Sequence, residues 1–285
     1  MLAFRRMTIS VILLGLLGVA WPGVAQEDEV VLLTHDSFAI SEDVLAAFEE
    51  ETGLRVQVAR LGDAGTLTNQ AVLSAGNPQG DAIFGMDNTF LSRALGGDIF
   101  APYTPANIDV VPEAFIPVNG AGQVTPITYG DVCINYDRAY FEENDLEIPQ
   151  SLRDLTEDPY SGLLVVQNPA TSSPGLAFLL ATIGAFGTDG DYTYQDFWAD
   201  LRANDVRVAQ DWTTAYYSDF SGASDGDRPL VVSYASSPPV ELIFSEDPPE
   251  EPTTGAIIAD ATCFRQIEYA GVLRGAENPE GAQQL

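Results

Sequence analysis

Short apolar segments alternate with helix-like segments from residue 29 to residue 96, and short loops connect them. Glu29–Thr34 (EVVLLT) is typical of a buried strand. Ser41 then provides a helix cap, acidic residues follow it, and Gly53 ends the helical pattern. Two more strand-like segments, each followed by a helix-like one, occupy residues 54–60 and 81–86. This alternation predicts an α/β fold with a parallel sheet that helices cover on both faces.

A second α/β pattern occupies residues 163–234, after a region of different composition. Residues 103–124 are rich in Pro, Gly and Asn, and residues 125–136 (TPITYGDVCINY) are typical of one long strand. Two α/β patterns joined by extended crossings predict a two-lobed ligand binder with its cleft between the lobes. We expect the first lobe to comprise residues 27–125 and about 240–285, and the second about 126–239.

Residues 1–25 have the pattern of a secretory signal peptide. Arg5 and Arg6 precede an apolar run from Ile9 to Ala20, and small residues follow. A membrane anchor is the alternative, but the apolar run is short for a membrane span. No cysteine follows the run, so we do not expect a lipid-anchored form. The sequence predicts an exported protein of the periplasm.

The charge of the chain is strongly negative, at −30, and all of its basic residues are arginines. Loss of the signal peptide would remove two arginines and bring the formal charge to −32. Nucleic acid is a poor partner for so acidic a surface, because phosphate contacts need Lys and Arg, and we expect no nucleic-acid binding. A cationic ligand would be attracted. The alternative is that the acidic residues serve solubility or adaptation to salt.

Cys133 and Cys263 are the two cysteines of the chain. Both lie in strand-like segments, and cysteines pair in an oxidising compartment, but the sequence leaves the pairing of these two open. One histidine and two distant cysteines give little support for a zinc site or for Cys/His catalysis. We therefore expect neither a metal centre nor an enzyme.

An aspartate stands in the loop after each of the first three predicted strands: Asp36, Asp63 and Asp87. Ligands of parallel α/β sheets bind beyond the carboxyl ends of the strands, where these loops meet. The three carboxylates are therefore candidates for binding a cationic ligand. The alternative is that each of them only caps a helix.

The stretch Asn168–Gly175 (NPATSSPG) lies between a predicted strand and a predicted helix. It supplies hydroxyl groups suited to capping, and Pro174 fits the first turn of a helix. Free N–H groups at a helix start attract anions, so Thr171–Gly175 is a candidate anion site. A capped helix without a ligand is the alternative.

Aromatic residues follow the strands of the second α/β pattern. Trp212 and Tyr234 each stand just past a strand, where we expect them to face the cleft, whereas we expect Tyr217 and Phe220 to pack in the core. Aromatic faces attract cations and stack on flat rings. Acids, aromatic faces and an N–H cradle together match a flat cationic heterocycle with a phosphate or hydroxyl tail.

At these residues the sequence resembles the thiamine-binding periplasmic proteins of ABC importers, which are two-lobed binding proteins of type II-like architecture. The similar strings occur in the family's order. They are Thr34–Ala39 (THDSFA), Leu61–Asp63 (LGD), Gly85–Asn88 (GMDN), Pro169–Leu176 (PATSSPGL), Trp212–Tyr216 (WTTAY) and Val232–Pro238 (VSYASSP). The resemblance implies capture of thiamine and its phosphates, delivery to a membrane permease, a monomer and no cofactor.

The resemblance also implies roles for individual residues. Asp63 with Gly62 would lie against the ligand, and the phosphate or hydroxyethyl end would meet Ser172, Ser173 and Gly175. The residues expected to flank the rings are Trp212, Tyr216 and Tyr234. The family usually has tyrosine at the position of His35, and a protonated imidazole would repel a thiazolium ring.

Two alternatives to this interpretation remain, and the sequence differs from the resembled family in one respect. The adjacent Tyr216 and Tyr217 suit a ferric-ion binder. In the ferric binders, however, the tyrosine pair follows the strand that corresponds to the one ending here at Tyr234, and this chain has a single tyrosine there. An enzyme on the same scaffold would need an activated cysteine or a carboxylate pair. The resembled family also continues for several helices beyond the strand-like residues 261–272, so we expect the sequence to be a fragment or truncated at Leu285.

Overall fold

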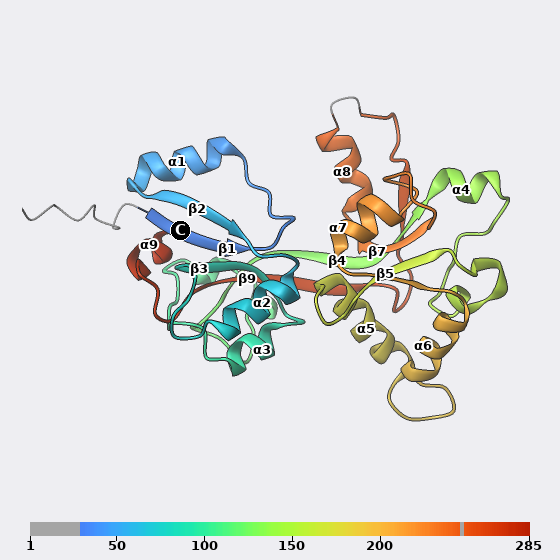
Figure 1. Cartoon of the computed structure of the whole chain (residues 1–285), viewed down its shortest axis with the longest axis horizontal. Coiled ribbons are helices and arrows are strands. Elements are labelled where there is room, and N and C mark those ends of the chain that lie inside the picture. Colours follow the sequence, from blue (N-terminus) through green and yellow to red (C-terminus); the bar gives the residue numbers. More distant parts are fainter. Residues whose placement is uncertain (1–28, 246–247) are drawn as a thin grey trace, which may run out of the picture.

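The computed structural model describes residues 29–245 and 248–285, and the predicted signal peptide lies outside them. Nine strands of this part of the chain form one sheet, in the order β2-β1-β3-β9-β4-β7-β5-β6, with β8 paired to β4. Figure 1 shows two groups of elements on this sheet, which we call the first and the second lobe. Within the described residues, none of the helices has the length and apolarity needed to span a membrane.

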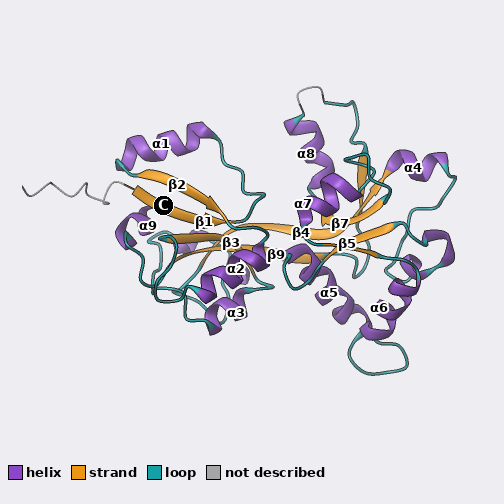
Figure 2. Ribbon diagram, in the orientation of Figure 1, coloured by secondary structure: helices purple, strands orange, loops and turns teal. Residues whose placement is uncertain are grey.

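The first lobe is built around four strands. It contains β1 (Glu29–Thr34), β2 (Arg55–Arg60), β3 (Ala82–Asp87) and β9 (Phe264–Val272), with α1 (Glu42–Thr52), α2 (Ala64–Leu73), α3 (Leu91–Gly96) and α9 (Pro279–Gln284). Helix α1 lies on one side of the sheet, and α2 and α3 lie on the other (Figure 2). Gly53 ends α1 in the left-handed conformation, as the sequence predicts, but α1 has no buried residue.

The second lobe repeats the arrangement with shorter strands. It contains β5 (Leu164–Gln167), β6 (Arg207–Ala209), β7 (Leu230–Tyr234), β8 (Thr254–Ile257), α4 (Arg138–Glu143), α5 (Ser173–Phe186), α6 (Tyr194–Ala203), α7 (Trp212–Thr214) and α8 (Ser237–Phe244). A π-helical turn, residues 215–219, continues α7. The division of the chain into lobes stays a prediction. The pairing of β8 with β4 nevertheless places residues 254–257 in the second lobe, later than the return near residue 240 that we expected.

Strand β4 (Thr125–Asp137) joins the two lobes. Its first part pairs with β9, and its last residues pair with β7 and β8. A disulfide between Cys133 on β4 and Cys263, next to β9, ties the crossing together. All pairings of β4 and β9 are antiparallel, whereas β1, β2 and β3 pair in parallel, and so do β5, β6 and β7. The predicted parallel sheet is therefore correct for β1, β2 and β3 and for β5, β6 and β7, and it is wrong for the antiparallel strands β4, β8 and β9.

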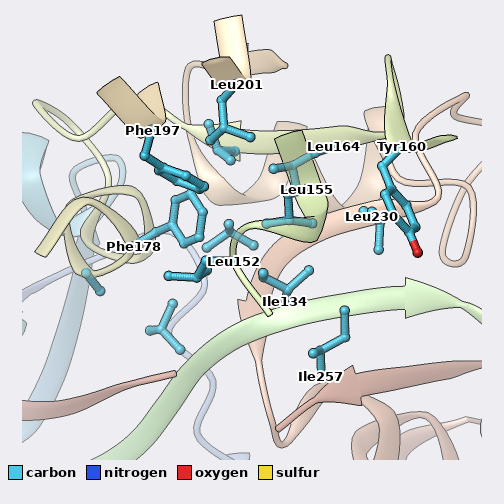
Figure 3. Close-up of a cluster of buried hydrophobic side chains, with 14 of the residues drawn as sticks. Ile134, Leu152, Leu155, Tyr160, Leu164, Phe178, Phe197, Leu201, Leu230 and Ile257 are labelled. Atoms are coloured by element: carbon cyan, nitrogen blue, oxygen red, sulfur yellow. The ribbon is translucent and has the colours of Figure 1, made fainter. Parts of the chain in front are cut away.

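Each lobe has its own apolar core. In the second lobe, Phe178 on α5 and Phe197 on α6 pack with Ile134 on β4 and with leucines of the connecting segments (Figure 3). In the first lobe, Phe90, Phe100 and other buried side chains pack between the sheet and helices α2 and α3. Two separate cores let each lobe keep its shape, so the geometry between them depends on the crossing strands and on contacts across the cleft.

Candidate functional site

A cavity of about 1570 Å³ lies between the lobes and is lined from both of them. The first lobe supplies the loop after β1 and the start of α2, and the second lobe supplies α7, α8 and the end of β7. The predicted site residues that line the cavity are Asp63, Ser173, Trp212, Tyr216 and Tyr234. The predicted site residues that lie outside the lining are Asp36, Gly62, Asp87, Thr171, Ser172 and Gly175.

One wall of the cavity is aromatic. The ring of Trp212 stacks on Tyr216, with centroids 5.1 Å apart and planes 20° apart, and meets Tyr234 edge-on at 6.3 Å. The indole nitrogen of Trp212 donates a hydrogen bond to the hydroxyl of Ser233 at 3.0 Å. Trp212 is half-buried, whereas Tyr216 is nearly fully buried beneath it. The wall is therefore a fixed platform on which a flat ring can stack.

Asp63 connects this platform to the first lobe. Its Oδ1 accepts a hydrogen bond from the backbone N–H of Ala64 at 2.7 Å, at the start of α2. Its Oδ2 accepts a hydrogen bond from the backbone N–H of Trp212 at 3.0 Å, across the cleft. Asp63 thus caps a helix and also positions the aromatic wall, so both of its oxygens already have partners in the protein.

At the start of α5, a serine of the second lobe contacts a carboxylate of the first lobe. The hydroxyl of Ser173 donates a hydrogen bond to Oδ2 of Asp87, and the amide nitrogen of Gln266 donates to the same hydroxyl at 2.8 Å. Asp87 is fully buried, and burial raises its pKa. The predicted anion site at the α5 start is therefore next to an acid that the protein itself supplies.

Of the other predicted residues of this segment, Thr171 contacts the first lobe, whereas Ser172 and Gly175 have contacts within the second. The backbone oxygen of Thr171 accepts a hydrogen bond from the N–H of Thr66 at 3.3 Å, and the Thr171 hydroxyl donates to the carbonyl of Gln210 at 2.8 Å. Ser172 is the helix cap by position, but its buried hydroxyl has no hydrogen-bond partner among the described residues. Gly175 lets α5 pass close to the end of β5, because a Cβ there would overlap the carbonyl of Gln167.

Asp36 and Gly62 pair with one another behind the cavity lining. The N–H of Gly62 donates to Oδ1 of Asp36 at 3.0 Å, and the N–H of Asp36 donates to the carbonyl of Gly62 at 2.9 Å. These bonds fix the loop after β1 against the loop after β2. Their observed contacts are structural, in line with the helix-cap and turn roles that are common for aspartate.

Sequence reasoning missed the acidic residue Glu268, on β9 at the floor of the cavity. Its Oε2 accepts a hydrogen bond from the hydroxyl of Thr128 at 2.5 Å, and its Oε1 lies 3.4 Å from Nε2 of His35. Burial acts to raise the pKa of Glu268, but the hydrogen bonds from His35 and Thr128 outweigh burial, so its pKa is lowered. The spacing of Gln266 and Glu268, two apart on one strand, placed both on the same face and could have identified them.

The carboxylates make the electrostatic field of the site negative. Burial raises the pKa of Tyr234 well above its ordinary value, and nearby negative charges raise it further. Those charges belong to Glu268, Asp63 and Asp87. The described residues that line the cavity include no arginine, and His35 is the one histidine among them. The site therefore favours a ligand with positive charge and a flat ring.

Residues 80–237, more than half of the chain, match the family described as bacterial extracellular solute-binding protein. The chain belongs to this family. A solute-binding protein is a component of transport and not an enzyme, as the sequence predicts. The family's extracellular character agrees with the predicted export.

The comparisons place this solute-binding protein among two-lobed periplasmic proteins. It is 28% identical over 262 residues to the thiamine-binding periplasmic protein of Salmonella typhimurium, covering 90% of this chain and 74% of that protein. The solved structure of a periplasmic thiamin binding protein matches with a TM-score of 0.75 and 27% identity, over 92% of this chain and 78% of that one. Iron-bound HitA from Pseudomonas aeruginosa matches with a TM-score of 0.71 and 20% identity, over 90% and 78%, which shows only the fold. The two-lobed fold and the resemblance to thiamine-binding proteins are thus confirmed.

Proposed function

We propose that this protein captures thiamine outside the cytoplasmic membrane and delivers it, as a monomer, to the permease of an ABC importer. The observation that carries the proposal is the pairing of an aromatic wall with carboxylates in one cavity between the lobes. Trp212 and Tyr234 offer faces for the two flat rings of thiamine, and Glu268 offers a negative charge for its thiazolium. The thiamine-binding names of the relatives support the same ligand.

Thiamine phosphates are a finer part of the proposal. The predicted N–H cradle at the start of α5 would receive the phosphate, but the carboxylate of Asp87 lies against Ser173 there. A phosphate would meet that negative charge at close range, which is unfavourable. We therefore expect thiamine monophosphate to bind, but no more tightly than thiamine.

The ferric alternative finds less support in the cavity. Iron(III) would require phenolate oxygen from the adjacent Tyr216 and Tyr217. Burial, reinforced by the charge of Glu241, raises the pKa of Tyr216 to about 12, which disfavours its phenolate. The ring of Tyr216 is also covered by the stacked indole of Trp212.

Thermal unfolding and tryptophan fluorescence test the proposal. A one-hundred-fold excess of thiamine over its Kd should stabilise the fold by about 2.7 kcal/mol and raise the Tm by roughly 5–10 °C. Stacking on Trp212 should also quench its fluorescence. The described tryptophans are Trp198 and Trp212, so the variant Trp212→Phe should lose the quench while Trp198, packed against Phe178, keeps its emission.

Fe(III) citrate and thiamine monophosphate serve as comparison ligands in the same titration. A response to Fe(III) with none to thiamine would overturn the proposed function in favour of the ferric alternative. Quenching that persists unchanged in Trp212→Phe would place the ligand elsewhere, because Trp198 lies in the core of the second lobe.

A further inference from the structure

The carboxylates of the cavity differ in how many of their oxygens are free to meet a ligand. Among the described lining residues the acids are Asp63, Glu241 and Glu268. Both oxygens of Asp63 accept hydrogen bonds from backbone N–H groups. Glu241, on α8, accepts hydrogen bonds from Thr253 and Thr254 and so holds the segment before β8. These two acids are committed to the architecture of the second lobe and of the cleft.

Glu268 has different neighbours. One partner is a neutral hydroxyl, that of Thr128, and the other is the imidazole of His35 at 3.4 Å. No arginine of the described chain forms an ion pair with Glu268. A carboxylate offers about four lone-pair positions, and these two neighbours leave some of them unused. Its side chain is 21% exposed, so the carboxylate is partly desolvated but reachable from the cavity.

The position of Glu268 relative to the aromatic wall completes the argument. Glu268 lines the same cavity as Trp212 and Tyr234. Gln266, two residues earlier on β9, links the same floor to Ser173 in the second lobe. A flat cationic ring bound against the aromatic wall would therefore share the cavity with the carboxylate of Glu268. In a cavity that excludes much of the water, such a charge is worth more than on the surface.

We propose that Glu268 is the specificity-determining residue of the site: it pairs with the positive ring of the ligand and selects cationic rings over neutral ones. Thr128 and His35 act as positioning residues that hold the carboxylate toward the cavity. This role rests on the proposed function, because thiamine supplies the positive ring. It differs from the roles of Asp63 and Asp87, whose contacts lie within the protein.

Calorimetric titration with two matched ligands tests the proposal. The first is thiamine, and the second is its neutral analogue in which a thiophene replaces the thiazolium. Wild-type protein should bind thiamine more tightly than the analogue. Glu268→Gln keeps the size of the side chain but removes the charge, and it should lower the affinity for thiamine by about tenfold or more. Its affinity for the neutral analogue should stay within about twofold of wild type.

The control variant is Asp131→Asn, which makes the same change in charge. Asp131 lies on β4, is paired with Arg265 and does not line the cavity. It should change the affinities for the two ligands by less than about twofold, and equally. A selective loss in this variant would mean that net charge, and not Glu268, sets the preference, which would overturn the proposal.

The remaining outcomes separate this proposal from the proposed function. Equal losses for both ligands in Glu268→Gln would show a structural role and overturn the proposal while thiamine binding by wild type stands. Unchanged thiamine affinity would overturn it in the same way. If Glu268→Gln does not fold, Glu268→Asp serves instead. It keeps the charge but moves it one methylene back from the cavity, and it should lower the affinity for thiamine alone. A wild-type protein that binds neither ligand would overturn the proposed function and this role together.

Discussion

At the scale of single residues, the buried acid Asp87 lies at the contact between the lobes. Its Oδ1 accepts hydrogen bonds from the hydroxyl and N–H of Thr89, and its Oδ2 accepts from Ser173 in the other lobe. Burial raises its pKa, so its contribution to stability is fully present below the pKa of the unfolded chain. That contribution is lost as the pH rises through the higher pKa of the folded state.

Asp87→Asn should therefore stabilise the fold relative to wild type at neutral pH, by on the order of 1 kcal/mol. The amide can still accept from Thr89 and can donate to Ser173. The amide of Gln266, whose Oε1 is buried without a partner, can turn to accept the freed hydroxyl hydrogen. Denaturant unfolding from pH 4 to pH 7.5 should show the advantage of the variant growing with pH.

Asp81→Asn is the matched control for this prediction. Asp81 is also buried, but its two oxygens accept from the N–H groups of Val31 and Asn278. In the variant, the amide NH2 group would face one of these two backbone N–H donors, so Asp81→Asn should lose stability. If Asp87→Asn lost as much stability as Asp81→Asn, the inference that burial of the Asp87 charge destabilises the fold would be wrong.

The residue scale also shows what a sequence can predict about a site. Asp63, Trp212 and Tyr234 could be assigned to the cleft because each lies at or just past the end of a strand, and strand ends meet at one edge of the sheet. The partner of Ser173 could not be predicted, because Asp87 is 86 residues away and only the closed contact of the lobes brings them together. The contacts of both residues therefore depend on tertiary structure and not on local pattern.

At the scale of elements, α2 of the first lobe packs closely against the loop before α5 of the second lobe. A Cβ on Gly65 would lie 2.6 Å from the carbonyl oxygen of Thr171 and 2.6 Å from the ring of Phe90. Both neighbours are constrained, since one is backbone and the other is buried in the core of the first lobe. Glycine at this position lets the lobes close.

Gly65→Ala should hold the lobes apart and weaken thiamine binding by about tenfold, because overpacking typically costs about 1–3 kcal/mol. The fold of each lobe should survive, since alanine favours a helix. Small-angle scattering of the free protein should show a larger radius of gyration. Gly184→Ala, in α5, is the control: no atom lies within 4 Å of its added Cβ, so affinity should not change. An unchanged affinity in Gly65→Ala would mean that binding does not need this contact.

Elements with a strong local pattern were predictable, and those defined by the fold were not. The strand at Leu164–Gln167 and the helix at Tyr194–Ala203 follow from their apolar runs and capping residues. Helix α8 begins at Ser237, and its prolines lie in the first turn, where they lose no helical hydrogen bond. Strand β8 has few apolar residues and forms because β4 offers it an edge.

At the scale of the whole molecule, the excess of acids sets the response to salt. The chain has 42 acidic and 12 basic residues, all of the latter arginine. Ion pairs such as Arg207 with Asp227 neutralise only a part of this charge. Repulsion among the remaining carboxylates opposes the compact state, and the same field attracts a cationic ligand. Both effects were visible in the sequence, whereas the position of the charges around the cleft was not.

Salt should therefore move stability and affinity in opposite directions. Between 0.1 M and 1 M NaCl the Debye length falls from about 10 Å to about 3 Å, which screens the repulsion between surface carboxylates. The Tm of the ligand-free protein should rise by several degrees, whereas the affinity for thiamine should fall.

Sucrose, which strengthens burial without screening charge, should raise the Tm and leave the affinity unchanged. The neutral analogue of thiamine should bind equally at both salt concentrations. A Tm that is flat or falling across the NaCl series would contradict the role of self-repulsion, and a salt-independent thiamine affinity would contradict electrostatic recognition in the cleft.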